Sequence, residues 1–587
     1  MITSAAELPD DLALTADLAV VGAGPAGIVV ALEIARQGFD VLLVESGYES
    51  FDPDVQNLAE AAEWDTKLHS PMSLTTRRQV GGTSVIWGGR CVPFDEVDFD
   101  RRPYIGAAQW PVSYEQMRTY FQRACDWLAC GRAVFETTEM RHLPRSIVPG
   151  FPEGDLRTST VERWSLPTNF GREYRKQLRH WPRVHVVTGL TCTQVVCQPG
   201  TPHVDHLECR SLDGKRLHVR ARGYVLSCGG LETTRLLLAS PGPAGKPLGD
   251  HSGHLGSWYI GHNEGVIANI RFYTPPKATI FGYERDIDGT YIRRRLSISR
   301  QTQHERHLPN VAAWLANPEL ADPRHLSGVL SFAYLMLRSP LGRRVASDAQ
   351  RLALTGETVP GSPYGGAERG SVRQHLRNMS CDPWPVVRFA AGFGSGRFLP
   401  HRRRVPGFFV YSKETLYPLQ YHGEQVPNPK SQVTLSGNRD AVGMPRLRID
   451  LKFMPQDADG IVRAHQLWDS FLRKFGVGRL EYLSPDPEEA VWSRLGGGFH
   501  QLGTTRMAAR PQDGVVDPNL AVHGSKNLFV ASSSAFVTAG QANPTFMIIA
   551  FAVRLADRLA AVLPSLPSPE DLNLPSASPV EGTTWHR

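Results

Sequence analysis

A glycine-rich turn near the N-terminus carries the clearest chemistry in the sequence. The run Gly22-Ala23-Gly24-Pro25-Ala26-Gly27 lies between an apolar run and a helical pattern. Gly22 allows a tight turn, Gly24 lets a pyrophosphate approach the backbone, and Gly27 lets the helix pack closely on the strand. Glu45 ends the next apolar run, where a carboxylate can accept hydrogen bonds from ribose hydroxyls. The pattern predicts a dinucleotide site and leaves FAD, NAD and NADP open, although the acid disfavours the 2′-phosphate of NADP.

The elements that must position these residues are short and well marked. Residues 18–21 form an apolar run of strand length, residues 28–37 follow a helical pattern that ends at Gly38, and residues 41–44 form a second apolar run. The N-terminus of the helix offers free N–H groups and the positive end of its dipole to phosphate. A second strand–Gly-Gly–helix unit spans residues 224–238. We expect its two glycines to let the chain pass close to the first turn.

A third glycine-rich stretch surrounds Trp87. Residues 81–89 contain four glycines, and this composition indicates a backbone that must come close to something flat or anionic. An ordinary glycine-rich turn is the alternative. Farther on, strand-like runs recur between residues 267 and 451, and they predict a mostly antiparallel sheet on the substrate side of the molecule.

Composition excludes several classes of protein. The chain has 587 residues, which predicts two to four domains, and a net charge of +6 on 122 charged residues does not indicate nucleic-acid binding. None of the eight cysteines forms a CxxC pair, so we expect reduced core thiols rather than a disulfide or zinc framework. The N-terminus lacks the basic and apolar parts of a signal peptide, and no apolar run reaches about 18 residues. These features predict a cytoplasmic protein without a membrane span.

The section between residues 300 and 404 is less informative. It contains an apolar helix candidate at 327–346, a glycine-rich stretch at 361–370 and a basic cluster at 401–404. The basic cluster could contact an anionic ligand or a membrane, but a solvated loop is the favoured interpretation. The tail from residue 564 is rich in proline and serine, which predicts disorder.

Several segments, in order along nearly the whole chain, resemble the glucose–methanol–choline (GMC) flavoprotein oxidoreductases. They are GAGPAG with its acid, VGGTSVIWGG, SCGGLETTRLLL, EQVPNP and the C-terminal block FHQLGTTRM…GVVDPNLAVHG…NLFVASSS…GQANPTFMIIA. The C-terminal block is the most specific part. Within the superfamily, WPVSY, EQVPNP and QANPT most resemble the bacterial branch with pyranose oxidases and glycoside 3-oxidases.

The resemblance implies FAD and a two-domain α/β fold (α+β overall). A Rossmann-like FAD-binding domain of GMC type would combine residues 1–115, 180–255 and 500–563. Residues 116–179 and 256–499 would form the substrate domain, and 564–587 the tail. The positions assigned to FAD are Gly22, Gly24, Pro25, Ala26, Gly27, Glu45, Gly81, Gly82, Thr83, Ser84, Trp87, Gly88, Gly89, Cys192, Ser227, Cys228, Ser532, Asn543, Pro544 and Thr545.

The resemblance also implies the catalytic pair. His500 in FHQLGT matches the family histidine, and Asn543 in QANPT matches the second position, which is His or Asn in relatives. Oxidising an alcohol requires loss of the hydroxyl proton and of a hydride from the same carbon, and imidazole suits the proton. Asn543 would orient the substrate oxygen. A purely structural His500 is the alternative. The helix after QANPT would direct its positive end at the flavin.

Two positions depart from the family pattern. Some relatives tether FAD covalently through a histidine just before the tryptophan of the glycine-rich loop, where this chain has Ile86. We therefore expect dissociable FAD. Many relatives also have Asp after the NL-x-V strand, where this chain has serines, so Ser532 would make a neutral version of that contact.

These features favour an FAD-dependent oxidoreductase acting on a CH–OH group of a sugar or glycoside. Three alternatives stay open: a tailoring enzyme for an apolar alcohol or secondary metabolite, suggested by the apolar residues 327–346, a lyase that binds FAD without redox turnover, and a binding protein. The electron acceptor, O₂ or an organic or protein acceptor, and the oligomeric state are not determined by any local motif.

Overall fold

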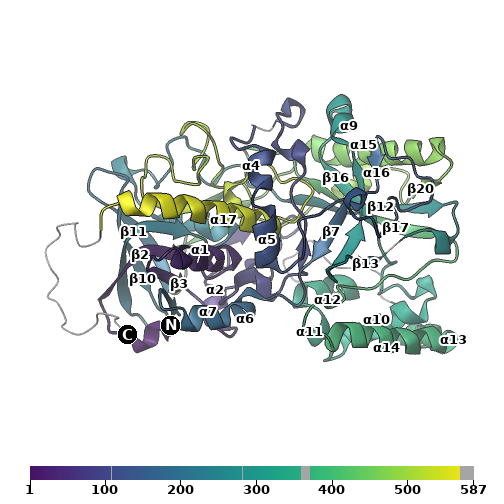
Figure 1. Cartoon of the computed structure of the whole chain (residues 1–587), viewed down its shortest axis with the longest axis horizontal. Helices are drawn as coiled ribbons and strands as arrows, with labels where there is room; N and C mark the ends of the chain where they lie inside the picture. The colour runs from purple at the N-terminus through teal and green to yellow at the C-terminus, as the bar shows by residue number, and fades with distance from the viewer. Residues whose placement is uncertain (107–108, 281, 358–369, 569–587) are drawn as a thin grey trace.

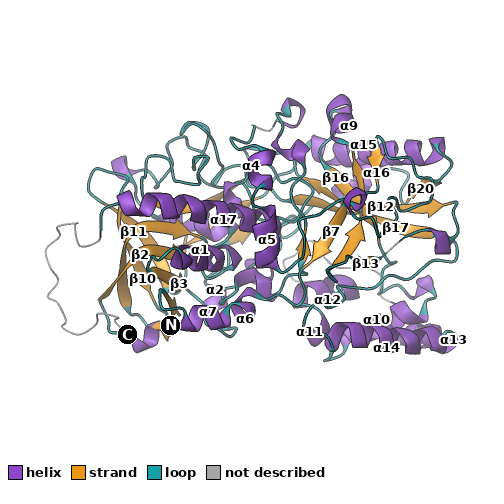
Figure 2. Ribbon diagram, viewed as in Figure 1, coloured by secondary structure: helices purple, strands orange, loops and turns teal. Residues whose placement is uncertain are grey.

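The computed structural model describes residues 1–106, 109–280, 282–357 and 370–568. Two large sheets lie side by side along the longest axis of the molecule, and Figure 1 shows the N-terminus beside the sheet that contains β2 and β3. Helices cover both sheets (Figure 2). The predicted glycine-rich stretch at 361–370 lies almost wholly outside the described residues, as does the predicted disordered tail beyond residue 568.

The first sheet has eight strands, and its core is parallel. Its order is β1 (Ile2–Ser4), β8 (Val184–Thr188), β3 (Val41–Glu45), β2 (Leu12–Val21), β11 (Arg216–Leu226), β10 (Val204–Arg210) and β9 (Thr191–Cys197), with β21 (Leu528–Val530) also paired to β11. Strands β1, β8, β3, β2, β11 and β21 run parallel to their neighbours, whereas β10 pairs antiparallel with both β11 and β9. This arrangement confirms the predicted Rossmann-like domain.

Burial on both faces explains why these segments become parallel strands. All of β3 and the last four residues of β2 are buried, as expected of near-continuous apolar runs in a parallel sheet. Helix α1 (Pro25–Arg36) follows β2 and packs on α17 (Thr545–Val562) from the far end of the chain. Parallel strands present their carboxyl ends at one edge, so the loops after β2, β3 and β11 meet there.

The second sheet has six strands, all antiparallel, which confirms the prediction. Its order is β20 (Gly478–Tyr482), β12 (His262–Phe272), β17 (Leu416–Glu424), β16 (Val311–Leu315), β15 (Leu296–Ile298) and β6 (Leu156–Arg157). Helix α15 (Pro455–Lys474) buries Trp468 against this sheet. The strands of the two sheets fall on either side of the predicted domain division, whose boundaries remain a prediction.

Two smaller sheets complete the strand inventory of the described residues. One joins β13 (Tyr283–Arg285), β14 (Tyr291–Arg294), β7 (Val161–Trp164) and β5 (Arg90–Cys91), and the other joins β18 (Gln432–Arg439), β19 (Pro445–Asp450) and β4 (Glu63–Trp64). The remaining helices are α2 (Pro53–Asn57), α3 (Met72–Thr75), α4 (Tyr114–Arg118), α5 (Phe121–Leu128), α6 (Phe170–Glu173), α7 (Arg175–His180), α8 (Gly230–Ala239), α9 (Arg300–Arg306), α10 (Gly328–Arg338), α11 (Gly342–Val345), α12 (Asp348–Thr355), α13 (Val372–Cys381), α14 (Pro383–Phe398) and α16 (Pro487–Trp492).

Two sequence patterns gave elements that differ from those they predict. The amphipathic pattern from Ser113 to about Cys130 predicts one helix, but it is split into α4 and α5, and the Thr119 hydroxyl between them donates to the Gln116 carbonyl at 2.8 Å. The strand-like run at residues 405–411 forms no strand, since proline and glycine at 406 and 407 oppose ladder pairing. No pattern in the sequence predicted α12, α13 and α14. Among the described residues, no helix is long and apolar enough to cross a membrane.

Candidate active site and cofactor cavity

An elongated cavity lies at the carboxyl edge of the parallel strands. It is bordered by the turn after β2, the end of β3, the ends of β9 and β11, the loop after β21 and the start of α17. Residues from the predicted set that line it are Gly22, Gly24, Pro25, Ala26, Glu45, Gly82, Thr83, Cys192, Ser227, Cys228, His500, Ser532, Pro544 and Thr545. Segments from both ends of the chain therefore border one continuous space.

The three glycines of the first turn meet different surroundings. A Cβ built on Gly22, which has φ +100°, would lie 2.7 Å from the Ser227 carbonyl oxygen, and one on Gly27 would overlap the Gly22 carbonyl oxygen. A Cβ on Gly24 would have no protein atom within 4 Å, although Gly24 borders the cavity. Packing thus explains Gly22 and Gly27, whereas the space beside Gly24 suits a group that approaches the backbone at the N-terminus of α1. This cradle fits a dinucleotide pyrophosphate.

Glu45 is held in place by the backbone. Its Oε2 accepts a hydrogen bond from Ala23 N–H and its Oε1 accepts one from Gly47 N–H, each at 2.7 Å. The side chain is buried and borders the cavity. Oε1 also accepts from the Ser46 hydroxyl at 3.4 Å, whereas Oε2 keeps a second lone pair with which it can accept a hydrogen bond from a ribose.

The loop around Trp87 shapes the cavity more than it lines it. A Cβ on Gly82 would lie 2.9 Å from Gly24 Cα, so the two glycine-rich loops touch. The Ser84 hydroxyl donates to the Gly81 carbonyl at 2.5 Å, and the Trp87 indole donates to the Thr168 carbonyl at 2.8 Å. The predicted residues that do not border the cavity are Gly27, Gly81, Ser84, Trp87, Gly88, Gly89 and Asn543.

The second Gly-Gly unit departs from the expectation. Ser227, rather than either glycine, lies against the first turn, and its hydroxyl donates to the Val21 and Gly22 carbonyls at 2.8 and 2.9 Å. A Cβ on Gly230 would overlap the Gln501 carbonyl instead. The chain does pass close to the first turn, but Ser227 and Cys228 make this approach, so the expectation that the two glycines allow it was wrong. Gly230 is needed at the start of α8 because this helix begins against the backbone of Gln501, the residue after His500.

The structure shows where Ser532 and Ile86, the two departures from the family pattern, lie. Ser532 borders the cavity directly after β21, and its hydroxyl accepts a hydrogen bond from Ser534 N–H at 3.2 Å. Ile86 follows a short 3₁₀ turn in the loop before Trp87. An isoleucine has no atom that could bond covalently to a flavin, whatever its distance.

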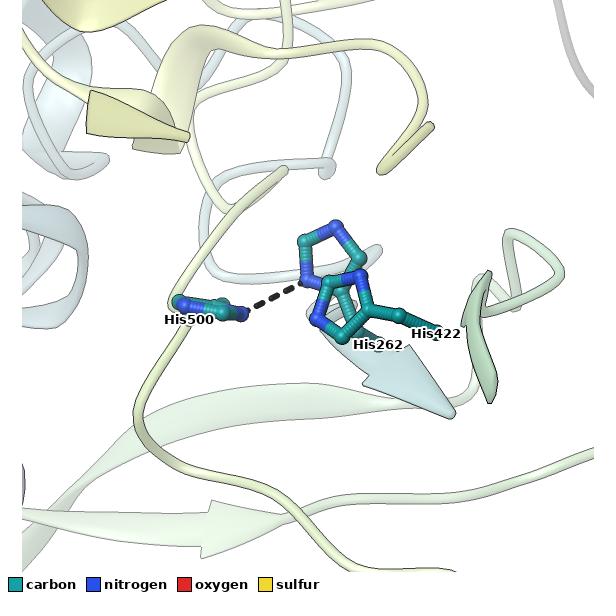
Figure 3. Close-up of side chains that lie close together, drawn as sticks. All are labelled: His262, His422 and His500. Carbon is teal, nitrogen blue, oxygen red and sulfur yellow. Dashed lines mark hydrogen bonds between the residues drawn. The ribbon is translucent and has the colours of Figure 1, made fainter. Parts of the chain in front are cut away.

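His500 lies at the end of the cavity near the start of α17, between two polar side chains. Asn543 Nδ2 is 2.9 Å from His500 Nε2, and His262 Nδ1 is 2.9 Å from His500 Nδ1. Figure 3 shows the His500 ring set edge-on to a stack formed by His262 and His422, whose ring centroids are 4.3 Å apart. The structure thus brings together the two predicted catalytic side chains, and two histidines that the sequence did not single out.

The register of the second sheet explains the histidine stack. His422 in β17 is directly opposite Glu264 in β12, so the two share a face of the sheet. Side chains alternate along a strand, which puts His262 on that same face. A motif search could not find this pair, because neighbouring antiparallel strands far apart in sequence decide it.

Burial and positive charge keep all three imidazoles neutral. Burial is the main cause that lowers the pKa of His500 to about 4, and the Arg90 guanidinium adds to it. The pKa values of His262 and His422 are also well below the ordinary value, mainly through burial, with the other histidines and Arg90 contributing. A neutral imidazole has a free lone pair, which is the form that a base requires.

Arg90 belongs to a cationic group beside the histidines. Glu162 is ion-paired with both Arg90 and Arg293, and both guanidiniums lie over the Trp314 ring, 4.3 and 4.4 Å from its centroid. Nitrogens of the three histidines lie within 4.8 Å of one another. His262 and His500 are at hydrogen-bond distance from each other, and the charge of Arg90 disfavours a second cation beside it. We therefore interpret the cluster as hydrogen-bonded imidazoles rather than metal ligands.

Several polar atoms around His500 have no partner within the described residues. They are Asn543 Oδ1, His422 Nε2 and Arg90 Nη2. Buried polar atoms are normally paired, and leaving one unpaired costs about 1–3 kcal/mol. A ligand with several hydroxyl groups would supply partners for both acceptors and donors.

Comparison with known proteins agrees with this geometry. Residues 427–552 match the family described as GMC oxidoreductase, and residues 17–51 match an FAD binding domain. The chain is 21% identical to 2-methyl-1,2-propanediol dehydrogenase of Mycolicibacterium austroafricanum, over 93% of this chain and 95% of that protein. It is 32% identical to C-glycoside 3-oxidase of Arthrobacter globiformis over 129 residues, 22% of this chain and 23% of that protein. A fungal aryl-alcohol oxidase structure has the same fold, with a TM-score of 0.51 and 14% identity over 94% of this chain and 99% of that one.

A parallel sheet with a dinucleotide cradle, and a cavity bordered by a histidine that contacts a histidine of the antiparallel sheet, together with the FAD-binding match, define an FAD-binding oxidoreductase. The matched segments and relatives narrow that class. Over residues 427–552 the chain is similar to GMC oxidoreductases, it has FAD as its cofactor, and its relatives include C-glycoside 3-oxidases, as the sequence predicted.

Proposed function

We propose that this enzyme oxidises a CH–OH group of a sugar or glycoside to a carbonyl, with His500 as the general base and Asn543 as the group that orients the substrate oxygen. The electron acceptor would be O₂ or an organic or protein acceptor. The alternative is oxidation of an apolar alcohol or secondary metabolite by the same residues.

The unpaired polar atoms around His500 are the observation that carries the sugar assignment. The unpaired atoms of Asn543, His422 and Arg90 suit a substrate with several hydroxyl groups, and an apolar substrate would leave them unpaired. The feature that suggested an apolar substrate points elsewhere. Helix α10 packs in its own apolar cluster with residues such as Leu320 and Phe408, and none of its residues borders the cavity.

The geometry around His500 suits the removal of a hydroxyl proton. A substrate hydroxyl that displaces the hydrogen bond between the two side chains would donate to His500 Nε2 and accept from Asn543 Nδ2. FAD, when bound in the cavity, supplies the acceptor for the hydride. The residues around Gly24, Glu45 and Ser227 would hold its ADP half, and the N-terminus of α17 at Thr545 would offer a positive dipole end to its ring system.

The function is tested by anaerobic reduction of the purified yellow protein. A panel of sugars and glycosides should bleach the flavin absorbance, whereas apolar alcohols of similar size should react more slowly, because they leave the polar lining unpaired. If apolar alcohols bleach the flavin and no sugar does, the alternative substrate class holds. Product formation with an unchanged flavin spectrum would instead identify a lyase.

We also expect FAD to be dissociable, because Ile86 cannot form a covalent bond to it. Denaturation in acid followed by centrifugation should release essentially all yellow colour and flavin fluorescence into the supernatant. An Ile86→His variant serves as the comparison, since it restores the side chain used by covalently linked relatives. Flavin fluorescence that stays with the denatured wild-type polypeptide on a gel would contradict the prediction.

A further inference from the structure

We propose that His262 sets the tautomer and the proton affinity of His500, acting as a neutral positioning residue behind the base. Nothing in the sequence motifs indicated this residue. The inference rests on the proposed role of His500 as the base. It follows from a chain of hydrogen bonds that begins at the backbone and ends at the nitrogen facing Asn543.

The first link is a backbone carbonyl, which can only accept a hydrogen bond. His262 Nε2 lies 3.1 Å from the Ala539 carbonyl oxygen, so Nε2 carries the proton of this neutral ring. The other nitrogen, Nδ1, therefore has a lone pair. Because the His262 ring is buried, exchange of this arrangement with water is disfavoured.

The second link transfers this constraint to the base. His500 Nδ1 lies 2.9 Å from His262 Nδ1. Because His262 Nδ1 has only a lone pair to offer, His500 Nδ1 must donate the hydrogen bond. The proton of the neutral His500 ring is then on Nδ1, and Nε2 is free to accept. Asn543 Nδ2–H donates to that Nε2 at 2.9 Å, which agrees with the same assignment. The tautomer of His500 with its proton on Nδ1 satisfies its contacts with His262 and Asn543, and it is the one that can act as a base toward a substrate hydroxyl.

His422 is held in the same way from the neighbouring strand. Its Nδ1 lies 2.7 Å from the Gln541 carbonyl oxygen and therefore donates, which leaves Nε2 as an acceptor. The carbonyls of Ala539 and Gln541 belong to the segment that leads into Asn543 and α17. One backbone segment thus orients both supporting histidines and also supplies the second catalytic side chain.

The charge of the supporting residue distinguishes this site from the familiar acid–histidine pair. A carboxylate behind the base would stabilise the protonated ring, whereas the uncharged His262 does not. The other groups that bear on His500 are His422 on β17, Arg90 on β5 and the uncharged Asn543, and none of them is an acid. Burial and Arg90 keep His500 unprotonated in mildly acidic solution, and the neutral support adds no negative charge that would oppose them.

The test compares His262→Asp with His262→Asn, two side chains of equal size that each place an oxygen near the position of Nδ1 and differ in charge. The rate constant of anaerobic flavin reduction is measured as a function of pH. In the wild type the rate should fall only as pH drops toward about 4, where the pKa of His500 lies. In His262→Asp the fall should begin about one to three pH units higher, as expected for an added negative charge near the ring.

His262→Asn should keep the wild-type pH profile and much of the rate of flavin reduction. His262→Ala removes the acceptor of the His500 Nδ1–H hydrogen bond and should slow flavin reduction about tenfold, the rate equivalent of one lost hydrogen bond. A purely structural role would slow all three variants without moving the acid limb of the pH profile, and that result overturns the proposal. Failure of every sugar or alcohol to reduce the wild-type flavin would instead overturn the proposed function.

A second readout does not depend on turnover. In protein labelled with ¹⁵N-histidine, NMR of the wild type should show one ring protonated at Nδ1 and unprotonated at Nε2 that disappears in His500→Gln. In His262→Asp the same ring should become protonated at both nitrogens near neutral pH or slightly below it. A His500 ring protonated at Nε2 in the wild type would overturn the tautomer assignment directly.

Discussion

Replacing His500 by alanine is expected to slow anaerobic flavin reduction about 10²- to 10⁴-fold, the usual contribution of a general base. The change removes the Nε2 lone pair beside Asn543, and an amide cannot take its place because it does not accept a proton near neutral pH. The measurement is stopped-flow reduction under saturating substrate, with FAD content determined from the absorbance of each preparation.

A matched control separates loss of the base from loss of a buried imidazole. His465 in α15 is buried, and its Nδ1–H donates to the Ile461 carbonyl at 2.8 Å, outside the cavity. Burial lowers its pKa to about 4, as it does for His500. His465→Ala should lower the melting temperature and leave the reduction rate nearly unchanged. Full activity in His500→Ala would remove the base assignment altogether.

The second large effect is expected at Gly24, where alanine should weaken FAD binding at least tenfold, or about 1.4 kcal/mol. The new methyl group would meet no protein atom within 4 Å and would occupy the space beside the backbone that suits the pyrophosphate. Without added FAD, the melting temperature of this variant should therefore stay close to that of the wild-type apoprotein. Binding is measured by titrating FAD into apoprotein and following the quenching of flavin fluorescence.

Gly27→Ala, three residues away, provides the contrast. Its methyl group would overlap the Gly22 carbonyl and lie 2.6 Å from the Ser227 hydroxyl oxygen. Overpacking of this kind costs about 1–3 kcal/mol or more, so the apoprotein itself should melt at a lower temperature. If Gly24→Ala bound FAD like the wild type, the pyrophosphate would have to lie elsewhere in the cavity.

The local sequence was sufficient for the nucleotide-binding half of the molecule. The predicted apolar run, turn and helix become β2 and α1, although β2 begins earlier, at Leu12. Each of these elements depends on residues that are close in sequence. Apolar runs cause burial of the strands, glycine allows the turn, and proline at the first position of the helix favours its start there. The C-terminal block predicted His500 and Asn543 as a pair, and the structure places the two side chains 2.9 Å apart; their catalytic role remains a proposal.

Other features of the site depend on contacts between distant segments. Arg90 and Glu162 form an ion pair because β5 and β7 are neighbours, and His262 meets His422 because β12 pairs with β17 in one register. A shift of one residue in that register would turn one of the histidines to the opposite face. The split between α4 and α5 and the helices α12 to α14 likewise had no pattern strong enough to predict them.

The sequence by itself therefore determined the cofactor class, the parallel core, and the two side chains that we propose for catalysis, because short motifs with local geometry encode them. Only the tertiary structure decided how the base is supported. Two backbone carbonyls, of Ala539 and Gln541, impose the tautomers of His262 and His422, and a strand register brings those rings to His500. Hydrogen-bond direction and register arise when distant segments pack together, and no single stretch of the chain contains them.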